Sequence, residues 1–414
     1  MTQHPETPAG PRTAHADHPP PPSRTQLLDD ELLQAAQALK ERDLWRTPLT
    51  LQAGCAPTAQ LPHEAPLLFC SNNYLGLAND PRLIAAACAA TQQWGTGSGA
   101  SRLVSGTFDL HRQLERALAT LKGTADCVLF SSGYLANLGT ITALCGKGDA
   151  VVSDALNHAS IIDGCRLSGA MTLVYPHGQL DQCKERILQA KRAGARRVLI
   201  VTDSVFSMDG DLCDLPKLCD LADELGAVLM VDEAHATGVL GEGRGATYAL
   251  GQSGRVDVIM GTCSKALASL GGFVAGSQAL CDFLRNRARS FVFDTAPAPS
   301  VVAATLAAIS IVTSEPERAT RVCQLASHLA RSLRELGYDV PTPAAAIVPV
   351  MIGDSGKALA LSAALRQKGV LALAIRPPTV PVDTARIRLC PMATHTDTQL
   401  DAVIAAFADC RHLL

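Results

Sequence analysis

The sequence places an acid, a histidine and a lysine just after short apolar runs. Asp232 follows the run 228–231, with His235 three positions later, and Lys265 comes soon after the run 256–260. In an open α/β sheet, ligands bind beyond the carboxyl ends of the strands. If these runs are neighbouring strands, the three side chains meet in one crevice. Hydroxyl residues and glycine follow two further runs, in the segments 131–134 and 202–207.

This set of side chains matches the needs of one cofactor, pyridoxal 5'-phosphate (PLP). PLP requires a lysine that bonds to its aldehyde, a carboxylate that keeps its ring nitrogen protonated, and an anion site for its phosphate. Lys265 and Asp232 meet the first two needs. A helix that begins near Gly133 and Tyr134, with Thr262 beside the lysine, would offer amides and a hydroxyl to the phosphate. The sequence therefore predicts a PLP enzyme that uses Lys265.

Each of these residues, taken alone, has a simpler explanation. An aspartate after a strand usually caps a turn or helix, and a lysine is usually a solvated surface charge. A histidine such as His158 more often makes structural hydrogen bonds than catalyses a reaction. The glycines in 95–99 lack the GxGxxG spacing and follow no apolar strand, so they do not indicate a dinucleotide loop. Only the combination of residues favours PLP.

The elements that must position these residues follow an α/β pattern. Apolar runs alternate with helical segments between about residues 66 and 300, which predicts a large, mostly parallel sheet domain. A helix between two runs has Pro216 in its first turn and ends at Gly226. Residues 301–414, which begin with an Ala-rich helix, are expected to form a smaller α+β domain. The runs are 128–130, 151–152, 173–174, 198–201, 228–231, 256–260 and 273–275.

The remaining composition excludes several classes of protein. Residues 1–24 are rich in Pro, His and Thr, which predicts a disordered tail, and 25–65 are expected to form a helical arm with an amphipathic helix at 27–44. A net charge of -3 with interspersed signs gives no indication of nucleic acid or membrane binding. No apolar run approaches the roughly 20 residues of a bilayer span. The fourteen cysteines are scattered without a CxxC motif, which favours reduced thiols in the cytoplasm over disulfides or a metal site.

From about residue 68 onward, the chain resembles the α-oxoamine synthases, fold-type I PLP enzymes that join an amino acid to an acyl thioester. Six motifs carry the resemblance: SNNYLGL at 71–77, GSGASRLVSG at 97–106, NHAS at 157–160, VFSMDG at 205–210, VDEAH at 231–235 and SKAL at 264–267. The segment AIRPPTVP at 374–381 is most similar to the biotin-pathway branch of that family. That branch implies L-alanine and a pimeloyl thioester, of CoA or a carrier protein, as substrates.

The resemblance also implies roles for particular residues. Lys265 would bind the cofactor and act as general base, Asp232 would pair with the ring nitrogen, and His158 would stack on the ring. Arg388 would clamp the carboxylate of the amino acid. Further cofactor contacts are implied for Gly133, Tyr134, Ser207, His235, Thr262 and, from a partner subunit in a homodimer, Thr295. Further substrate contacts are implied for Arg46, Asn72 and Thr379.

The sequence leaves some alternatives open. The segment FDTAP at 293–297 departs from the usual family pattern, and Asp294 would bring a negative charge close to the phosphate. A sister synthase that uses glycine or serine, such as a glycine C-acetyltransferase or a serine palmitoyltransferase, fits most of the motifs. An aminotransferase shares the fold class. The intact Lys265, Asp232 and His235 argue against a non-catalytic PLP-binding subunit.

Overall fold

The computed structural model describes residues 23–42 and 44–413, so almost all of the predicted tail, 1–24, lies outside the described residues. The chain divides into two compact units, Met1–Pro48 and Leu49–Leu414. In the first unit, helix α1 spans Arg24–Glu41, close to the helix predicted at 27–44. Ser23 begins it with a capping box, in which its side chain accepts from the backbone N–H of Gln26. The role of this unit as an arm stays a prediction.

Seven strands form the main sheet of the second unit, in the order β2-β8-β7-β6-β5-β3-β4. Each of the seven predicted apolar runs contributes to one of these strands. Strand β8 runs in the opposite direction to the other six, which confirms the mostly parallel sheet. The strands are β2 (Asp126–Phe130), β3 (Ala150–Asp154), β4 (Met171–Tyr175), β5 (Val198–Asp203), β6 (Val228–Asp232), β7 (Val258–Thr262) and β8 (Gly272–Gly276).

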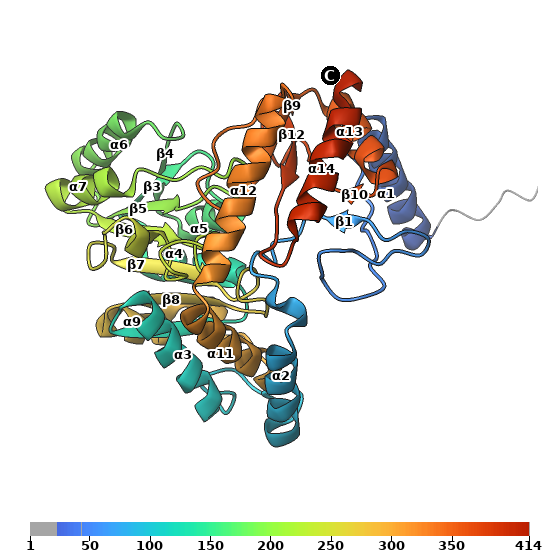
Figure 1. Ribbon diagram of the computed structural model, residues 1–414. Helices are drawn as coiled ribbons and strands as arrows, with labels where there is room; N and C mark the ends of the chain where they lie inside the picture. The colour runs from blue at the N-terminus through green and yellow to red at the C-terminus, as the bar shows by residue number, and fades with distance from the viewer. Residues whose placement is uncertain (1–22, 43, 414) are drawn as a thin grey trace, which may run out of the picture. The chain divides into compact units, whose positions relative to one another are not determined.

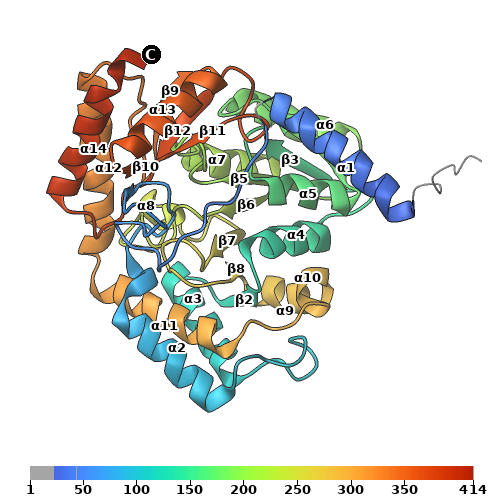
Figure 2. The same ribbon diagram turned by 90° about the vertical axis from the view of Figure 1, so that its right-hand side faces the viewer.

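Helices cover both faces of this sheet. Successive side chains of a strand point to opposite faces, so each strand contributes apolar residues to two core clusters. Ile200 and Val231 belong to one core cluster, and their neighbours Val201 and Met230 belong to the other. The first face packs against α3 (Asp109–Lys122), α6 (Leu180–Arg192), α7 (Leu215–Leu225) and α11 (Pro299–Ser314). The second packs against α4 (Gly133–Leu144), α5 (Ala159–Ser168), α9 (Gln278–Arg287) and α10 (Arg289–Val292) (Figures 1 and 2). Helix α7 ends at Gly226 in the left-handed conformation, as predicted.

The C-terminal part of the chain builds a second core around a three-stranded antiparallel sheet, which confirms a smaller α+β domain. Its strands are β9 (Val348–Gly353), β11 (Leu373–Ile375) and β12 (Ala385–Leu389), and its helices are α12 (Glu317–Glu335), α13 (Ser355–Gln367) and α14 (Asp397–Asp409). The short strand β1 (Leu67–Leu68) pairs with β10 (Val370–Leu371), while α2 (Pro81–Trp94) lies against α11. Helix α11 packs in the core of the main sheet, although the sequence analysis assigned its residues from 301 onward to the C-terminal domain. The domain boundary at 300/301 stays a prediction.

No single helix within the described residues is long and apolar enough to cross a bilayer. Helices α11 and α12 meet that test only as a pair, and they are bent by 79° at the break between them.

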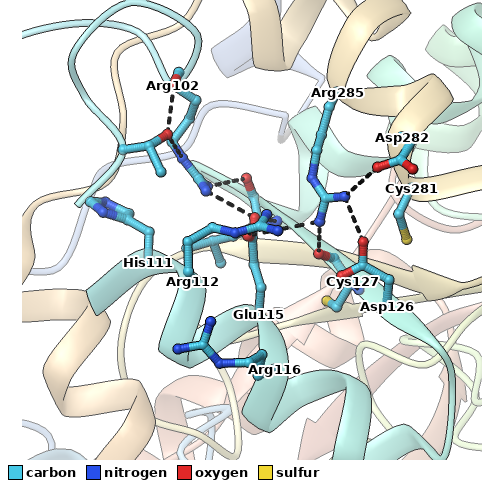
Figure 3. A network of polar contacts seen from close by, with 12 residues as sticks. Arg102, His111, Arg112, Glu115, Arg116, Asp126, Cys127, Cys281, Asp282 and Arg285 are labelled. Atoms are coloured by element: carbon cyan, nitrogen blue, oxygen red, sulfur yellow. Dashed lines mark hydrogen bonds and ion pairs between the residues drawn. The ribbon is translucent and has the colours of Figure 1, made fainter. Parts of the chain in front are cut away.

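A buried ion-pair network fixes the glycine-rich motif at 97–106 to the main sheet (Figure 3). Glu115 on α3 accepts from Arg102 of this motif, with 3.0 Å between Oε1 and Nη2. Arg285 on α9 lies 3.9 Å from the other carboxylate oxygen of Glu115 and 2.5 Å from Asp126. A buried carboxylate is tolerated only when cations or hydrogen bonds compensate its lost hydration. The network therefore holds the motif in one position against β2.

Candidate active site

The carboxyl ends of β3, β5, β6 and β7 surround a cavity of about 200 Å³. This is the crevice that the sequence predicts, because the parallel strands end at the same edge of the sheet. The predicted cofactor contacts among its lining residues are Gly133, Tyr134, His158, Asp232, His235, Thr262 and Lys265.

Lys265 lies at the bottom of the cavity beside His235. Its Nζ is 2.8 Å from Nε2 of His235, and the other ring nitrogen is 2.7 Å from the hydroxyl of Tyr74. Burial lowers the pKa of Lys265 to about 8. Burial, aided by the charge of Lys265, also lowers the pKa of His235 well below its usual value. A neutral imidazole next to an amine of reduced basicity suits proton transfer near neutral pH.

Asp232 faces the cavity from the end of β6. Its Oδ2 accepts from Nδ2 of Asn137 at 2.7 Å, and its Oδ1 accepts from the backbone N–H of Ala234 at 2.8 Å. These two hydrogen bonds fix the orientation of the Asp232 side chain. Asp203 occupies the matching register position on β5. Burial and the nearby Asp232 raise the pKa of Asp203 well above its usual value, so the two acids do not carry like charges side by side.

His158 lies where β3 leads into α5. Its backbone N–H donates to Oδ2 of Asp203 at 2.8 Å, and its Nδ1 lies 2.7 Å from Oγ of Ser160. Its ring stands 6.4 Å from the ring of Tyr134, edge to face. Burial lowers the pKa of His158, which favours a neutral ring that can stack on another aromatic system.

Backbone amides and hydroxyls gather at the start of α4. Ser132 caps this helix, with its Oγ accepting from the N–H of Leu135 at 3.2 Å. A Cβ at Gly133 would approach Oγ1 of Thr262 to 3.3 Å, so glycine keeps this corner open. Oγ1 of Thr262 in turn lies 2.8 Å from Oγ of Ser264. A helix N-terminus with adjacent hydroxyls is a site for an anion such as phosphate.

These groups fit PLP. The start of α4 can receive the phosphate, Asp232 can pair with a protonated ring nitrogen, and Lys265 can bond to the aldehyde. All three line one cavity. The fit depends on the chemistry of the donor groups and on the open corner at Gly133.

A fixed arginine lies next to the cavity residues. Arg388, buried on β12, donates to Oδ1 of Asn72 at 3.1 Å, to the hydroxyl of Tyr74 at 3.2 Å and to the carbonyl of Ser207. Because three groups hold its guanidinium, it is preorganised for a planar carboxylate. Ser207 takes part here through its backbone rather than through its hydroxyl.

Two predicted contacts in the second unit, Thr295 and Thr379, are not among the residues that line the cavity. Thr295 pairs with Ser101, and its carbonyl accepts from Oγ of Ser131 at 3.1 Å. Thr379 lies exposed in the loop between β11 and β12. Arg46 belongs to the first unit, Met1–Pro48, whereas the cavity lies in the second. The roles of these three residues stay predictions.

Comparisons with known proteins place the chain in a family. The family described as aminotransferase class I and II matches residues 64–407. The 8-amino-7-oxononanoate synthase of Geobacter sulfurreducens is 47% identical over 375 residues, which cover 90% of this chain and 95% of the relative. The same enzyme of Symbiobacterium thermophilum is 46% identical over 382 residues, which cover 92% and 97%. The chain belongs to the 8-amino-7-oxononanoate synthase family. The prediction of an α-oxoamine synthase that depends on PLP is thereby confirmed.

Solved structures agree on the fold of this family. A serine palmitoyltransferase with PLP superposes with a TM-score of 0.88 at 32% identity, covering 94% of this chain and 99% of the other. The 8-amino-7-oxononanoate synthase of Francisella tularensis gives 0.72 at 26% identity, covering 83% and 97%. The backbone is thus shared by sister synthases, so the fold does not separate them.

Several residues around the cavity were not singled out from the sequence. Tyr74 and Ser160 lie inside motifs that signalled the family, yet nothing in their spacing indicated that they contact His235 and His158. Asn137 lies in mid-helix, where amides are usually solvent-facing, and here it donates to Asp232. A polar residue inside the apolar helix α4 was the available signal for Asn137.

Proposed function

We propose that the protein condenses L-alanine with a pimeloyl thioester and releases carbon dioxide, giving 8-amino-7-oxononanoate, the product named by its relatives. The observation that carries the proposal is the buried Lys265, 2.8 Å from His235 in a cavity that also contains Asp232. When bound, PLP draws electrons from the α-carbon of the amino acid. The surrounding residues then orient the substrate and move its proton.

We infer that Lys265 is the general base. Its amine, once released from the cofactor, takes the α-proton of alanine, because a pKa of about 8 leaves a useful neutral fraction near neutral pH. Asp232 keeps the ring nitrogen protonated, and His158 covers one face of the ring. The α-carbon then bonds to the thioester carbonyl carbon, the thiol leaves, and loss of the alanine carboxyl group as carbon dioxide completes the exchange. Lys265 can return the proton.

Arg388 is proposed to hold the alanine carboxylate. Its guanidinium is fixed by Asn72, Tyr74 and the carbonyl of Ser207, so a bidentate contact costs little ordering entropy. The contacts of Thr379 and Arg46 with the acyl substrate rest on the family motif alone.

We further propose a homodimer in which Thr295 reaches the cofactor phosphate of the partner subunit. The support is a set of exposed apolar side chains on two neighbouring segments, Leu103, Val104 and Phe293, which are 52%, 80% and 72% exposed. A hydrogen bond between the N–H of Ala296 and the carbonyl of Ala100 joins the two segments that carry it. Exposed apolar surfaces of this kind mark interfaces. A cytoplasmic location is proposed as well, because all fourteen cysteines are free thiols in the described chain.

A competition assay tests the proposed reaction. Alanine, glycine and serine are offered together with pimeloyl-, acetyl-, succinyl- and palmitoyl-CoA, and the products are identified by mass spectrometry. We expect alanine with the pimeloyl thioester to dominate, with glycine disfavoured by about 10–200-fold, the range for one methyl group in a pocket. The alternative is a serine palmitoyltransferase activity, because the fold superposes on that of a serine palmitoyltransferase with a TM-score of 0.88. Serine with palmitoyl-CoA as the preferred pair would move the chain to that activity.

A further inference from the structure

A histidine outside the cavity, His177, connects two segments of the chain that lie close to the cavity. The turn after β3 carries His158, and the loop after β5 carries Ser207. His177 lies between them, with Nδ1 3.0 Å from Oδ1 of Asp154 and Nε2 2.9 Å from Oδ2 of Asp211. We propose that His177, as an imidazolium, is a positioning residue that ties these two segments together and so sets the walls of the cofactor cavity. This inference rests on the proposed function for the roles of His158 and Ser207.

The geometry around His177 requires a charged ring. A neutral imidazole has one N–H, so one of its nitrogens would present a lone pair to a carboxylate oxygen. Only the imidazolium donates to both Asp154 and Asp211. The ring of Phe206 packs against it edge to face, with 4.3 Å between ring centroids. In agreement, the hydrogen bonds that the ring donates to the two carboxylates raise the pKa of His177 to about 10.

Other ionisable groups near this cluster do not compete for the proton. The charge of Asp154 helps to raise the pKa of four of them: Tyr175, Cys183, Cys213 and Asp203. Burial is the largest cause of the raised pKa in each of these four groups, and it disfavours their charged forms. The charge balance of the cluster is therefore one imidazolium against two carboxylates.

Asp154 links His177 to the turn that carries His158. It is the last residue of β3 and is 3% exposed. Its Oδ1 also accepts from the backbone N–H of Leu156 at 2.9 Å, and its carbonyl accepts from the N–H of Asn157 at 3.3 Å. These bonds shape the turn that ends at His158, the first residue before α5. A shift of Asp154 would therefore move the ring that lines the cavity.

Asp211 does the same for the loop that carries Ser207. The N–H of Phe206 donates to the carbonyl of Asp211 at 3.0 Å, which closes the loop into a compact turn. The carbonyl of Ser207 at the top of this turn accepts from Arg388. His177 is not among the residues that line the cavity, so it acts through these neighbours. Loss of His177 should therefore disturb the position of Arg388 as well as the binding of the cofactor.

The first test is His177→Gln in the cofactor-loaded enzyme, with His328→Gln, an exposed histidine on α12, as the control. We expect PLP to dissociate roughly ten-fold more readily and the KM for alanine to rise by a similar factor, the effect of losing one hydrogen bond to a charged group. The circular dichroism of the bound cofactor should change, whereas the control should keep all three values. A purely structural role would lower thermal stability without changing the dichroism band or KM.

A second variant and a measurement on the cofactor-free protein keep the test independent of folding and of substrate. If the contact acts as one unit, His177→Gln combined with Asp211→Asn should be no worse than His177→Gln alone. In protein with 15N-labelled histidine, the signal that His177→Gln lacks should stay that of an imidazolium up to about pH 10. A neutral ring at pH 8, or PLP binding and KM equal to wild type, would overturn the inference. Failure of the alanine assay with an intact NMR result would instead overturn only the proposed function.

Discussion

The hydroxyl of Tyr74 lies 2.7 Å from Nδ1 of His235, inside the protein. The same hydroxyl donates to Asn72 and accepts from Arg388. Because its only proton goes to Asn72, His235 donates from Nδ1, and its Nε2 is left to accept from Lys265, 2.8 Å away. One tyrosine therefore connects the proposed base to the proposed carboxylate clamp, and fixes the tautomer between them.

Replacing this hydroxyl should weaken alanine turnover. In Tyr74→Phe we expect kcat/KM for alanine to fall by about ten-fold, because His235 and Arg388 lose a shared partner, and the net loss is taken as that of one hydrogen bond worth roughly 1–2 kcal/mol. PLP should still bind, which its absorbance would show. Tyr248→Phe, at a half-exposed ring, is the matched control and should not differ from wild type. Unchanged steady-state kinetics in Tyr74→Phe would remove Tyr74 from the mechanism.

Attachment of PLP to the cofactor-free protein should accelerate with rising pH. The amine of Lys265 attacks the aldehyde only when it is neutral, and burial lowers its pKa to about 8. The attachment rate should therefore rise as the pH passes through about 8 and level off above it, as followed by absorbance in stopped flow. After borohydride reduction, peptide mapping should find the label on Lys265, and Lys265→Ala should take none. A label on another lysine would contradict the assignment.

Asp232→Asn should separate cofactor binding from catalysis. The amide keeps the shape of the side chain but can accept only one of the two hydrogen bonds that Asn137 and Ala234 donate to Asp232, and it cannot hold a proton on the ring nitrogen by charge. We expect PLP to remain bound and kcat to fall by at least about 100-fold, the size of losing one preorganised electrostatic group. Equilibrium dialysis and steady-state kinetics measure the two effects. Near-normal turnover would show that the charge of Asp232 is dispensable.

The proposed dimer can be tested on its apolar surface. Charged substitutions at Val104 and Phe293, made as Val104→Asp with Phe293→Asp, should give a monomer by light scattering and lower the activity by at least about ten-fold. Leu167→Asp, at a leucine 68% exposed on α5, serves as the control and should leave the assembly intact. Mixing Lys265→Ala chains with Thr295→Ala chains should restore part of the activity. A fully active monomer would exclude a shared site.

Much of the architecture follows from local sequence patterns. Each of the seven apolar runs contributes to a strand of the main sheet, and Pro216 and Gly226 bound a helix in the structure, because apolar periodicity and backbone restrictions act over a few residues. The combination of residue types that follow the strand ends, Lys265 and Asp232 among them, favoured PLP. Motifs then identified the family, which the comparisons confirm.

What the sequence could not supply is the distance between residues far apart in the chain. Tyr74 and His235 are 161 positions apart, and Arg388 is 314 positions from Tyr74. Their contact depends on the strand order, which places β5, β6 and β7 side by side, and on the docking of β12 from the C-terminal domain. The strength of a hydrogen bond falls when the donor–acceptor distance grows by a few tenths of an ångström. Residue types therefore determined which cofactor the protein uses, and tertiary structure alone decided which side chains hold Lys265, Asp232 and Arg388 in place.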